Sequence, residues 1–295
     1  MVEVGDLLLA MYGATSGDIA VSKIKGAINQ AILCIRTRQN KKFIESVWNK
    51  HVSKNLRKYL QGGQGNLSAD IVKGISFFFP TLKEQEKIAN LVSLLDERIA
   101  TQNKIIEDLK KLKSAISEKL FKAVKGDVIM LSEICEISKG KQINGEFLSE
   151  KGKYYVMNGG IESSGYYNNY NVEANTISIS EGGNSCGYVQ FNTSPFWSGG
   201  HCYTIQNIVR GVDNLYLYHY LKSKEDAIMK LRIGSGLPNI QKKDLAMFKI
   251  KIPPTEQQKT ISTFLSSLER KTEIEEHILN AIQKEKQYIL RQMFI

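Results

Sequence analysis

The segment FFPTLKEQEKIANLVSLLDERI, residues 78–99, returns later in the chain as IPPTEQQKTISTFLSSLERKT, residues 252–272. A shift of about 173 positions superimposes the apolar residues of the two segments, and their steps of three and four predict a helix with one apolar stripe. A repeat of so long a period indicates two duplicated modules rather than a solenoid of short repeats.

Each apolar stripe continues beyond its quoted segment and has the spacing of a coiled-coil seam. Polar residues interrupt the two stripes at matching places, Gln102 with Glu275 and Lys113 with Lys286, and such residues fix the register of a helix pair. A long amphipathic helix can also pack within its own domain, but the duplication favours pairing of the two copies. The expected seam residues are Ile88, Val92, Leu95, Ile99, Ile106, Leu109, Ile116, Leu120, Ile261, Leu265, Leu268, Leu279, Ile282, Ile289 and Met293.

Proline marks the start of both predicted helices, because Pro80 and Pro253-Pro254 close extended apolar runs just before them, and Gly126 is expected to end the first helix. Each helix is expected to have about 35 to 40 residues and a length on the order of 55 to 60 Å. At the two helix starts the Glu-Gln pairs, Glu84-Gln85 and Glu256-Gln257, are one position out of step. These boundaries predict a first domain at 1–80, a spacer helix at 81–125, a second domain at 126–253 and a distal spacer helix at 254–295.

The second module is expected to be a β-rich domain with one helix, at residues 214–231. Its short apolar runs are separated by Gly and Asn, which is typical of closely spaced strands, and they lie at 128–140, 154–160, 176–183, 187–191 and 202–206. The first module matches only the later part of this plan, so about 45 residues have no counterpart in it. Its core is therefore expected to be incomplete, with unpaired strand edges.

The composition favours a polyanionic partner. The formal net charge is +10 and the sequence pI is about 9.2, and Lys and Arg side chains gain binding free energy by releasing counterions from phosphates. No apolar run approaches the length of a membrane span, and the first residues lack the pattern of a secretory signal, so a cytoplasmic location is expected. The cysteines, Cys34, Cys135, Cys186 and Cys202, lack a CxxC spacing and are expected to be reduced structural thiols.

Taken together, the two module-helix units resemble the specificity (S) subunit of type I restriction-modification systems. The resemblance covers essentially the whole chain, with an N-terminally incomplete first target-recognition domain. It rests on the helix starts PTLKEQEKI and PPTEQQKTI and on the module openings LSEICEISKGKQI and Phe196-Trp197. It implies an α+β fold: two β-rich target-recognition domains, separated and followed by long helices that pair as an antiparallel coiled coil.

The resemblance also implies a function without catalysis by this chain. Each target-recognition domain of an S subunit reads one half of a split site in double-stranded DNA, and two modification (methyltransferase) subunits dock on the framework. S-adenosylmethionine, ATP and Mg belong to the partner subunits, among them the restriction (translocase and nuclease) subunits, so no cofactor and no metal is expected on this chain. Self-pairing through the helices is a further possibility, and no membrane partner is expected.

Loop position and side-chain chemistry indicate the candidate DNA-binding residues. Lys, Asn, Gln and Ser side chains discriminate base edges, and Lys also contacts phosphates. The candidates are Lys139, Lys141, Gln142 and Asn144 after the first strands of the second module, Ser235, Asn239, Lys242 and Lys243 in its tail, and Gln64, Asn66 and Ser68 in the first module.

Two alternatives to a complete S subunit remain open. The chain can be a truncated partial subunit, acting as a homodimeric half-reader or as an inactive recombination cassette. It can also be a DNA methyltransferase or nuclease with an unrecognised site. The sequence has no Gly-Lys-Ser/Thr ending on its glycine-rich segments and no HExxH pattern around its four isolated histidines, so no catalytic residue is assigned.

Overall fold

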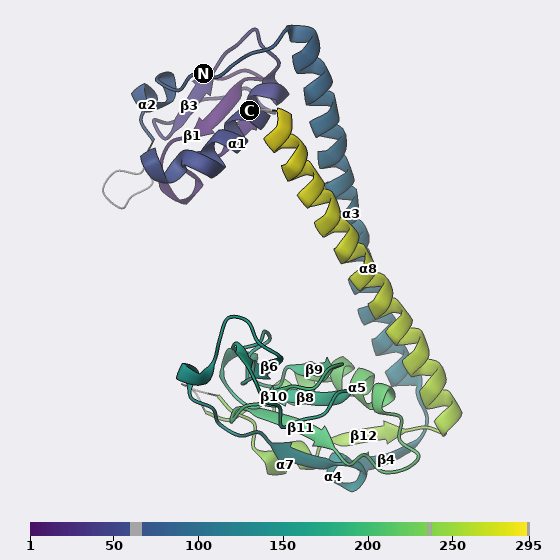
Figure 1. Ribbon diagram of the computed structural model, residues 1–295. Coiled ribbons are helices and arrows are strands. Elements are labelled where there is room, and N and C mark those ends of the chain that lie inside the picture. Colours follow the sequence, from purple (N-terminus) through teal and green to yellow (C-terminus); the bar gives the residue numbers. More distant parts are fainter. Residues whose placement is uncertain (60–66, 235, 237, 294–295) are drawn as a thin grey trace. The chain divides into compact units, whose positions relative to one another are not determined.

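The computed structural model describes residues 1–59, 67–234, 236 and 238–293, with the backbone alone for 53–59. The chain divides into two compact units: unit 1 comprises Met1–Ile106 and Ile274–Ile295, and unit 2 comprises Glu107–Glu273. The boundary falls within both long helices, α3 (Leu82–Ala123) and α8 (Thr255–Met293), so each unit contains one module with part of each helix (Figure 1). The first helix ends three residues before Gly126, which follows it in an irregular connection.

Unit 2 is built on a four-stranded antiparallel sheet with the strand order β5-β11-β8-β9. The strands are β5 (Glu136–Lys139), β8 (Thr176–Ser180), β9 (Val189–Asn192) and β11 (Cys202–Gln206). The central strands β8 and β11 pair with Cys202 opposite Ser180 and Ile205 opposite Ile177. Their β-branched residues Ile177, Ile179 and Ile205 are buried, which anchors this sheet in the core.

Two smaller sheets complete unit 2. Strand β4 (Asp127–Met130) pairs with β12 (Lys249–Ile252), and β6 (Tyr154–Met157) lies between β7 (Tyr166–Tyr167) and β10 (Trp197–Ser198). The prediction of strand alone for 128–140 was wrong, because the short helix α4 (Leu131–Ile134) separates β4 from β5. Glu133 accepts a hydrogen bond from the backbone N–H of Met130, which favours this turn.

The helices of unit 2 cover the sheet and share one apolar core with it. They include α5 (Asn214–Ser223), α6 (Glu225–Met229) and α7 (Lys242–Ala246). The single helix expected at 214–231 is thus two helices, interrupted at Lys224, whose backbone leaves the helical range. The core extends from the sheet to both long helices, and its members include Phe121, Leu131, Ile134, Ile179, Tyr216, Leu217, Ile250, Ile261 and Leu265.

Unit 1 contains a three-stranded counterpart of this sheet. The order is β2-β1-β3, with β1 (Leu7–Ala10), β2 (Ile19–Val21) and β3 (Ile32–Ile35). These strands correspond to β8, β9 and β11 in that order, and a 3-10 turn follows both β1 and its counterpart β8. Helix α1 (Lys41–Tyr59) stands where α5 stands, and α2 (Ala69–Lys73) stands where α7 stands. No described strand of unit 1 corresponds to β5.

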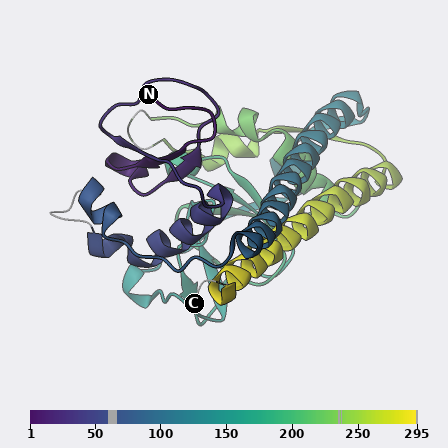
Figure 2. The same cartoon turned by 90° about the horizontal axis from the view of Figure 1, so that it is seen from above.

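Within each unit the segments of α3 and α8 run antiparallel, side by side in both views (Figures 1 and 2). In unit 1 Asp96 pairs with Lys286, and in unit 2 Lys113 pairs with Glu269. The buried Gln102 donates a hydrogen bond to the carboxylate of Glu275 and another, at 3.1 Å, to its carbonyl oxygen. Each expected seam residue is buried or half-buried. Of the polar interruptions read from the sequence, Gln102 and Glu275 contact each other, whereas Lys113 and Lys286 each form an ion pair with the facing helix.

A buried glutamine fixes the start of each long helix. Gln258 accepts a hydrogen bond from the backbone N–H of Asp213 at 2.8 Å and donates to the carbonyls of Gly211 and Pro253. Gln85 makes the matching contacts in unit 1, with the N–H of Asn40 at 3.0 Å and the carbonyl of Pro80 at 2.8 Å.

These contacts correct the alignment of the two helix starts. Gln85 corresponds to Gln258, not to Gln257, so the shift between the repeats continues without a break. Asn40 and Asp213, whose N–H groups the glutamines bind, cap α1 and α5 through their side chains. The glutamine therefore joins the helix start to the cap of the neighbouring helix. Among the described residues, no helix has the length and apolarity that crossing a membrane requires.

Candidate functional site

One end of the four-stranded sheet in unit 2 gathers most of the candidate residues of that unit. At this end β5 and β8 finish and β9 and β11 begin, because Tyr203 pairs with Lys139 and Cys202 with Ser180. The loop from β5, the turn between β8 and β9 and the loop before β11 therefore meet there. The segment around Asn239 joins them through a bridge to Gly182.

Glu181 is the buried polar centre of this end. One carboxylate oxygen, Oε1, accepts from the Lys139 ammonium at 2.6 Å and from the Tyr203 hydroxyl at 2.9 Å. The other, Oε2, faces Nδ1 of His201 at 3.7 Å and has no hydrogen-bond partner among the described residues. Burial, together with the neighbouring Glu181, raises the pKa of Tyr203 above its ordinary value, so this hydroxyl stays a hydrogen-bond donor. Glu181 therefore ties β5, β8 and β11 together.

The loop after β5 is held against the loop before β11 by backbone contacts. Lys141 donates its N–H to the carbonyl of Ser198 at 2.8 Å, and its own carbonyl accepts from the Trp197 indole at 2.9 Å. Gln142 lies against Gly200, where an added Cβ would come within 2.5 Å of its side-chain oxygen. Asn144 is exposed and precedes the 3-10 turn Gly145–Phe147 without capping it. The backbone is fixed while these polar side chains remain available.

The second group of candidates enters from the tail of the module. Asn239 exchanges backbone hydrogen bonds with Ile233, and the N–H of Ile240 donates to the carbonyl of Glu181 at 2.8 Å. Lys242 and Lys243 begin α7 and are exposed. Ser235 lies outside the described residues.

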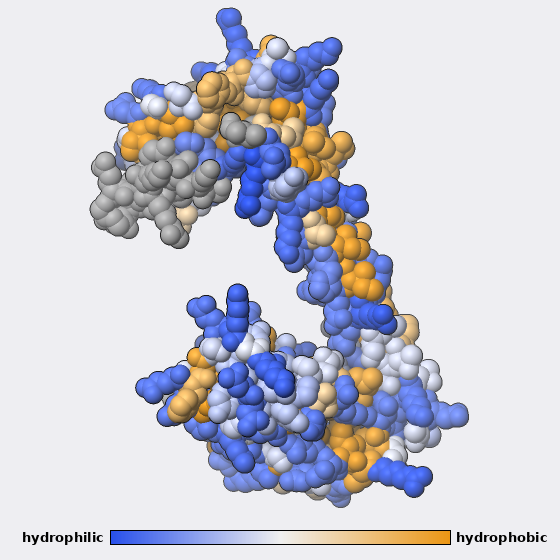
Figure 3. Space-filling model, in the orientation of Figure 1, coloured by the Kyte–Doolittle hydropathy of each residue, from blue (hydrophilic) through white to orange (hydrophobic). Residues whose placement is uncertain are grey.

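The charges at this end of the sheet differ in their availability. Lys139 is neutralised by Glu181. In contrast, Lys141, Lys242 and Lys243 are exposed and take part in none of the ion pairs among the described residues. The face of unit 2 shown in Figure 3 is largely hydrophilic. Lysines contact phosphates, and Gln142, Asn144 and Asn239 carry the donors and acceptors that pair with base edges.

Unit 1 keeps the scaffold of this site and changes its chemistry. Met11 stands where Glu181 stands: its carbonyl accepts from Ser16 at 3.0 Å and from the N–H of Leu67 at 2.7 Å, as the carbonyl of Glu181 accepts from Cys186 and Ile240. Ser68 caps α2 by accepting from the N–H of Ile71 at 3.1 Å. Two further candidates, Gln64 and Asn66, lie outside the described residues.

Sequence reasoning missed Glu181 and His201, which lie among the candidates. The available signal was a charged residue directly after an alternating strand, in the segment TISISEGG. The sequence did not reveal that this carboxylate is buried among three strands.

The remaining reactive groups are buried or isolated. Among the described residues no group of three or more His, Cys, Asp or Glu side chains is arranged to hold a metal ion. The four cysteines are free thiols, and burial raises the pKa of Cys135 to about 12 and that of Cys202 to about 11. These two thiols are protonated at neutral pH, which suits packing rather than nucleophilic chemistry.

The family comparison agrees with this arrangement. The model of the type I restriction modification DNA specificity domain matches residues 2–111 and 124–284. The chain belongs to this family. A putative type I specificity subunit of Mycoplasma pneumoniae is 36% identical over 145 residues, which cover 48% of this chain and 38% of that protein. A putative type I restriction enzyme specificity subunit of Methanocaldococcus jannaschii is 28% identical over 275 residues, which cover 80% of this chain and 63% of the relative. Each match thus spans less than two thirds of its relative.

Solved structures support the fold. The crystal structure of a type I restriction-modification S subunit from M. genitalium aligns over 100% of this chain and 84% of that one, with a TM-score of 0.74 and 21% identity. A second chain, from a study of complex assembly in a type I system, covers 99% of this chain and 82% of its own length, with a TM-score of 0.63 and 18% identity. The expectation of an α+β fold with two β-rich domains and long helices is confirmed.

Proposed function

We propose that this member of the type I specificity family recognises a split site in double-stranded DNA and performs no chemistry itself. Each module reads one half of the site. The paired helices carry the modules, and α3, with 42 residues, has a length of about 60 Å.

The observation that carries this proposal is the loop-bearing end of the sheet in unit 2. It combines exposed lysines that form no ion pair within the described part of the chain with exposed amide side chains, on a backbone fixed by hydrogen bonds. A fixed backbone lowers the entropy lost when side chains are ordered on a ligand. Lysines supply affinity for phosphates, whereas amide groups discriminate bases.

Catalysis is assigned to partners in this proposal. Two modification subunits that bind S-adenosylmethionine dock on the chain, and restriction subunits that use ATP and Mg join the complex. The assembly works in the cytoplasm.

The test is to coexpress the chain with the modification subunit encoded beside it and to map methylated adenines across the host genome by single-molecule sequencing. A split, asymmetric motif supports reading by both modules. The absence of any new motif, with the complex assembled on size exclusion, contradicts the proposal.

The lysines at the sheet end can be tested separately by DNA binding. The double variant Lys242→Ala, Lys243→Ala should reduce the slope of log K against log salt by about 2, since each lost phosphate contact removes about 0.9. Lys249→Ala is the matched control, because this exposed lysine lies on β12. Equal salt slopes for both variants would place the phosphate contacts elsewhere.

A second candidate is a half-reader that uses unit 2 alone. The supporting observation is that β3, at the edge of its sheet, has no described strand as the partner that β5 provides for β11 in unit 2. In this case two copies each contribute their second module, and the methylation map shows a split palindrome.

A further inference from the structure

One segment of unit 2 covers two separate surfaces of its module. The strand β4 of this segment pairs with β12, with Ile129 opposite Ile250. Its helix α4 places Leu131 and Ile134 in the core, at 0% and 3% exposure. Its last strand, β5, then pairs with the outer edge of β11. Residues 127–139 therefore form a strand-helix-strand unit that closes the module.

The first of these surfaces is uncovered in unit 1. Strand β3, the counterpart of β11, pairs with β1 on one edge, and no ladder among the described residues uses its other edge. Each of its residues, Ile32–Ile35, is half-buried, whereas Cys202–Ile205 of β11 are buried. An open strand edge presents unpaired N–H and C=O groups to a further strand.

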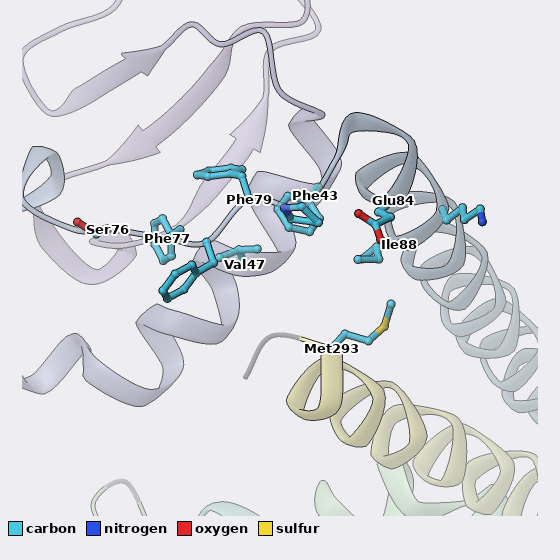
Figure 4. A pocket seen from close by; sticks show the side chains of 11 residues that line it. Phe43, Val47, Ser76, Phe77, Phe79, Glu84, Ile88 and Met293 are labelled. Atoms are coloured by element: carbon cyan, nitrogen blue, oxygen red, sulfur yellow. The ribbon is translucent and has the colours of Figure 1, made fainter.

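The second surface is also uncovered. Residues 76–79, the counterpart of β12, form no strand, and no ladder among the described residues includes them. Phe78 is 95% exposed and Phe79 is 44% exposed. Beside them is a cavity of about 760 Å³, lined mainly by apolar side chains, among them Phe43, Val47, Ile88 and Met293 (Figure 4).

The core of unit 1 shows the same deficit. Unit 2 has one continuous main core that includes Leu131 and Ile134. Among the described residues of unit 1, two smaller clusters are found instead, one that contains Leu9 and Trp48 and another that contains Phe43 and Val47. Phe77 packs at the margin of both clusters.

We propose that the open edge of β3 and the cavity beside residues 76–79 together bind one strand-helix-strand segment that is patterned like residues 127–139. Two observations select this occupant: one surface needs a backbone partner, and the other takes apolar side chains. The described chain contains this segment once, where unit 2 buries it. This inference does not depend on the proposed function, because it concerns only how unit 1 is completed.

The probe is a synthetic peptide of residues 124–140, VKGDVIMLSEICEISKG, added in excess to the full chain under reducing conditions. Hydrogen exchange of unit 1 is followed by mass spectrometry. Binding should slow exchange at residues 33–36 and 76–79 by about tenfold, the effect of about 1.4 kcal/mol of added protection. The control peptide carries Leu131→Asp and Ile134→Asp, so it keeps the backbone and loses the apolar side chains. The control leaves the protein unaltered.

Each outcome decides the proposal. The proposal is supported if the peptide of residues 124–140 slows exchange at residues 33–36 and 76–79 and the control peptide does not. No protection, or equal protection by both peptides, overturns it. Protection confined to residues 202–206 and 249–252 also overturns it, because the peptide has then exchanged into unit 2. If protection instead rises with protein concentration without peptide, a second copy of the chain is the occupant and the proposal fails.

Discussion

Replacing Gln258 by Ala should destabilise unit 2 by about 3 kcal/mol. The side chain makes three hydrogen bonds, to Asp213, Gly211 and Pro253, at 2.8, 3.0 and 2.8 Å. Each hydrogen bond contributes about 1 kcal/mol to stability, and in the Ala variant all three backbone groups lose this partner. For a domain of this size a loss of about 3 kcal/mol lowers Tm by about 6 to 12 °C.

The neighbouring Gln257 supplies the control. It is exposed, and its replacement by Ala should change stability by no more than about 0.5 kcal/mol. The free energy of unfolding is measured by urea denaturation, with circular dichroism as the readout. In addition, Gln258→Glu retains an acceptor for Asp213 but loses both donors, so it should be at least as unstable as the Ala variant. Equal midpoints for the Gln257 and Gln258 variants would refute this account of the helix start.

Three further perturbations test other parts of the structure. Burial lowers the pKa of His219 from 6.5 to about 4, so between these pH values the unfolded chain binds a proton that the native chain does not. This histidine should therefore lower the stability by about 3 kcal/mol as the pH falls through this window. Unfolding followed against pH should show a fall that is smaller by this amount in His219→Gln, and equal falls would contradict this. Ile282→Asp puts a charge into the helix pair of unit 1 and should cost more than about 3 kcal/mol, whereas Ile278→Asp, at an exposed position, should be tolerated on thermal melts and size exclusion. Gly140→Ala should destabilise unit 2, because the added Cβ would overlap the carbonyl oxygen of Gly199 in the loop before β11. The control is Gly145→Ala, since the space around Gly145 is open. Equal Tm values for the two variants would contradict this.

The sequence predicted the features that depend on residue periodicity. The residues assigned to the seam are buried or half-buried. Apolar residues at steps of three and four lie on one face of a helix, and that face packs against the other helix. The polar pair Gln102 and Glu275 was expected to interrupt the seam, and the two residues contact each other there.

Features that depend on long-range partners were not predictable in this way. Residues 75–79 have the composition of a strand but form none, since a strand needs a hydrogen-bonded neighbour. No role was assigned to Glu181 from the sequence, yet its carboxylate is buried and binds Lys139 and Tyr203. The DNA contacts of the candidate residues remain predictions.

The contacts of Gln85 and Gln258 also bear on how this chain can change over evolutionary time. Gln258 binds only main-chain atoms of Gly211, Asp213 and Pro253. Main-chain atoms are present whatever the side chains are, so the residues that contact the glutamine can be replaced while its hydrogen bonds are kept. A module with an entirely different binding surface can therefore be exchanged onto the same helix, provided that its cap places one N–H group opposite the glutamine.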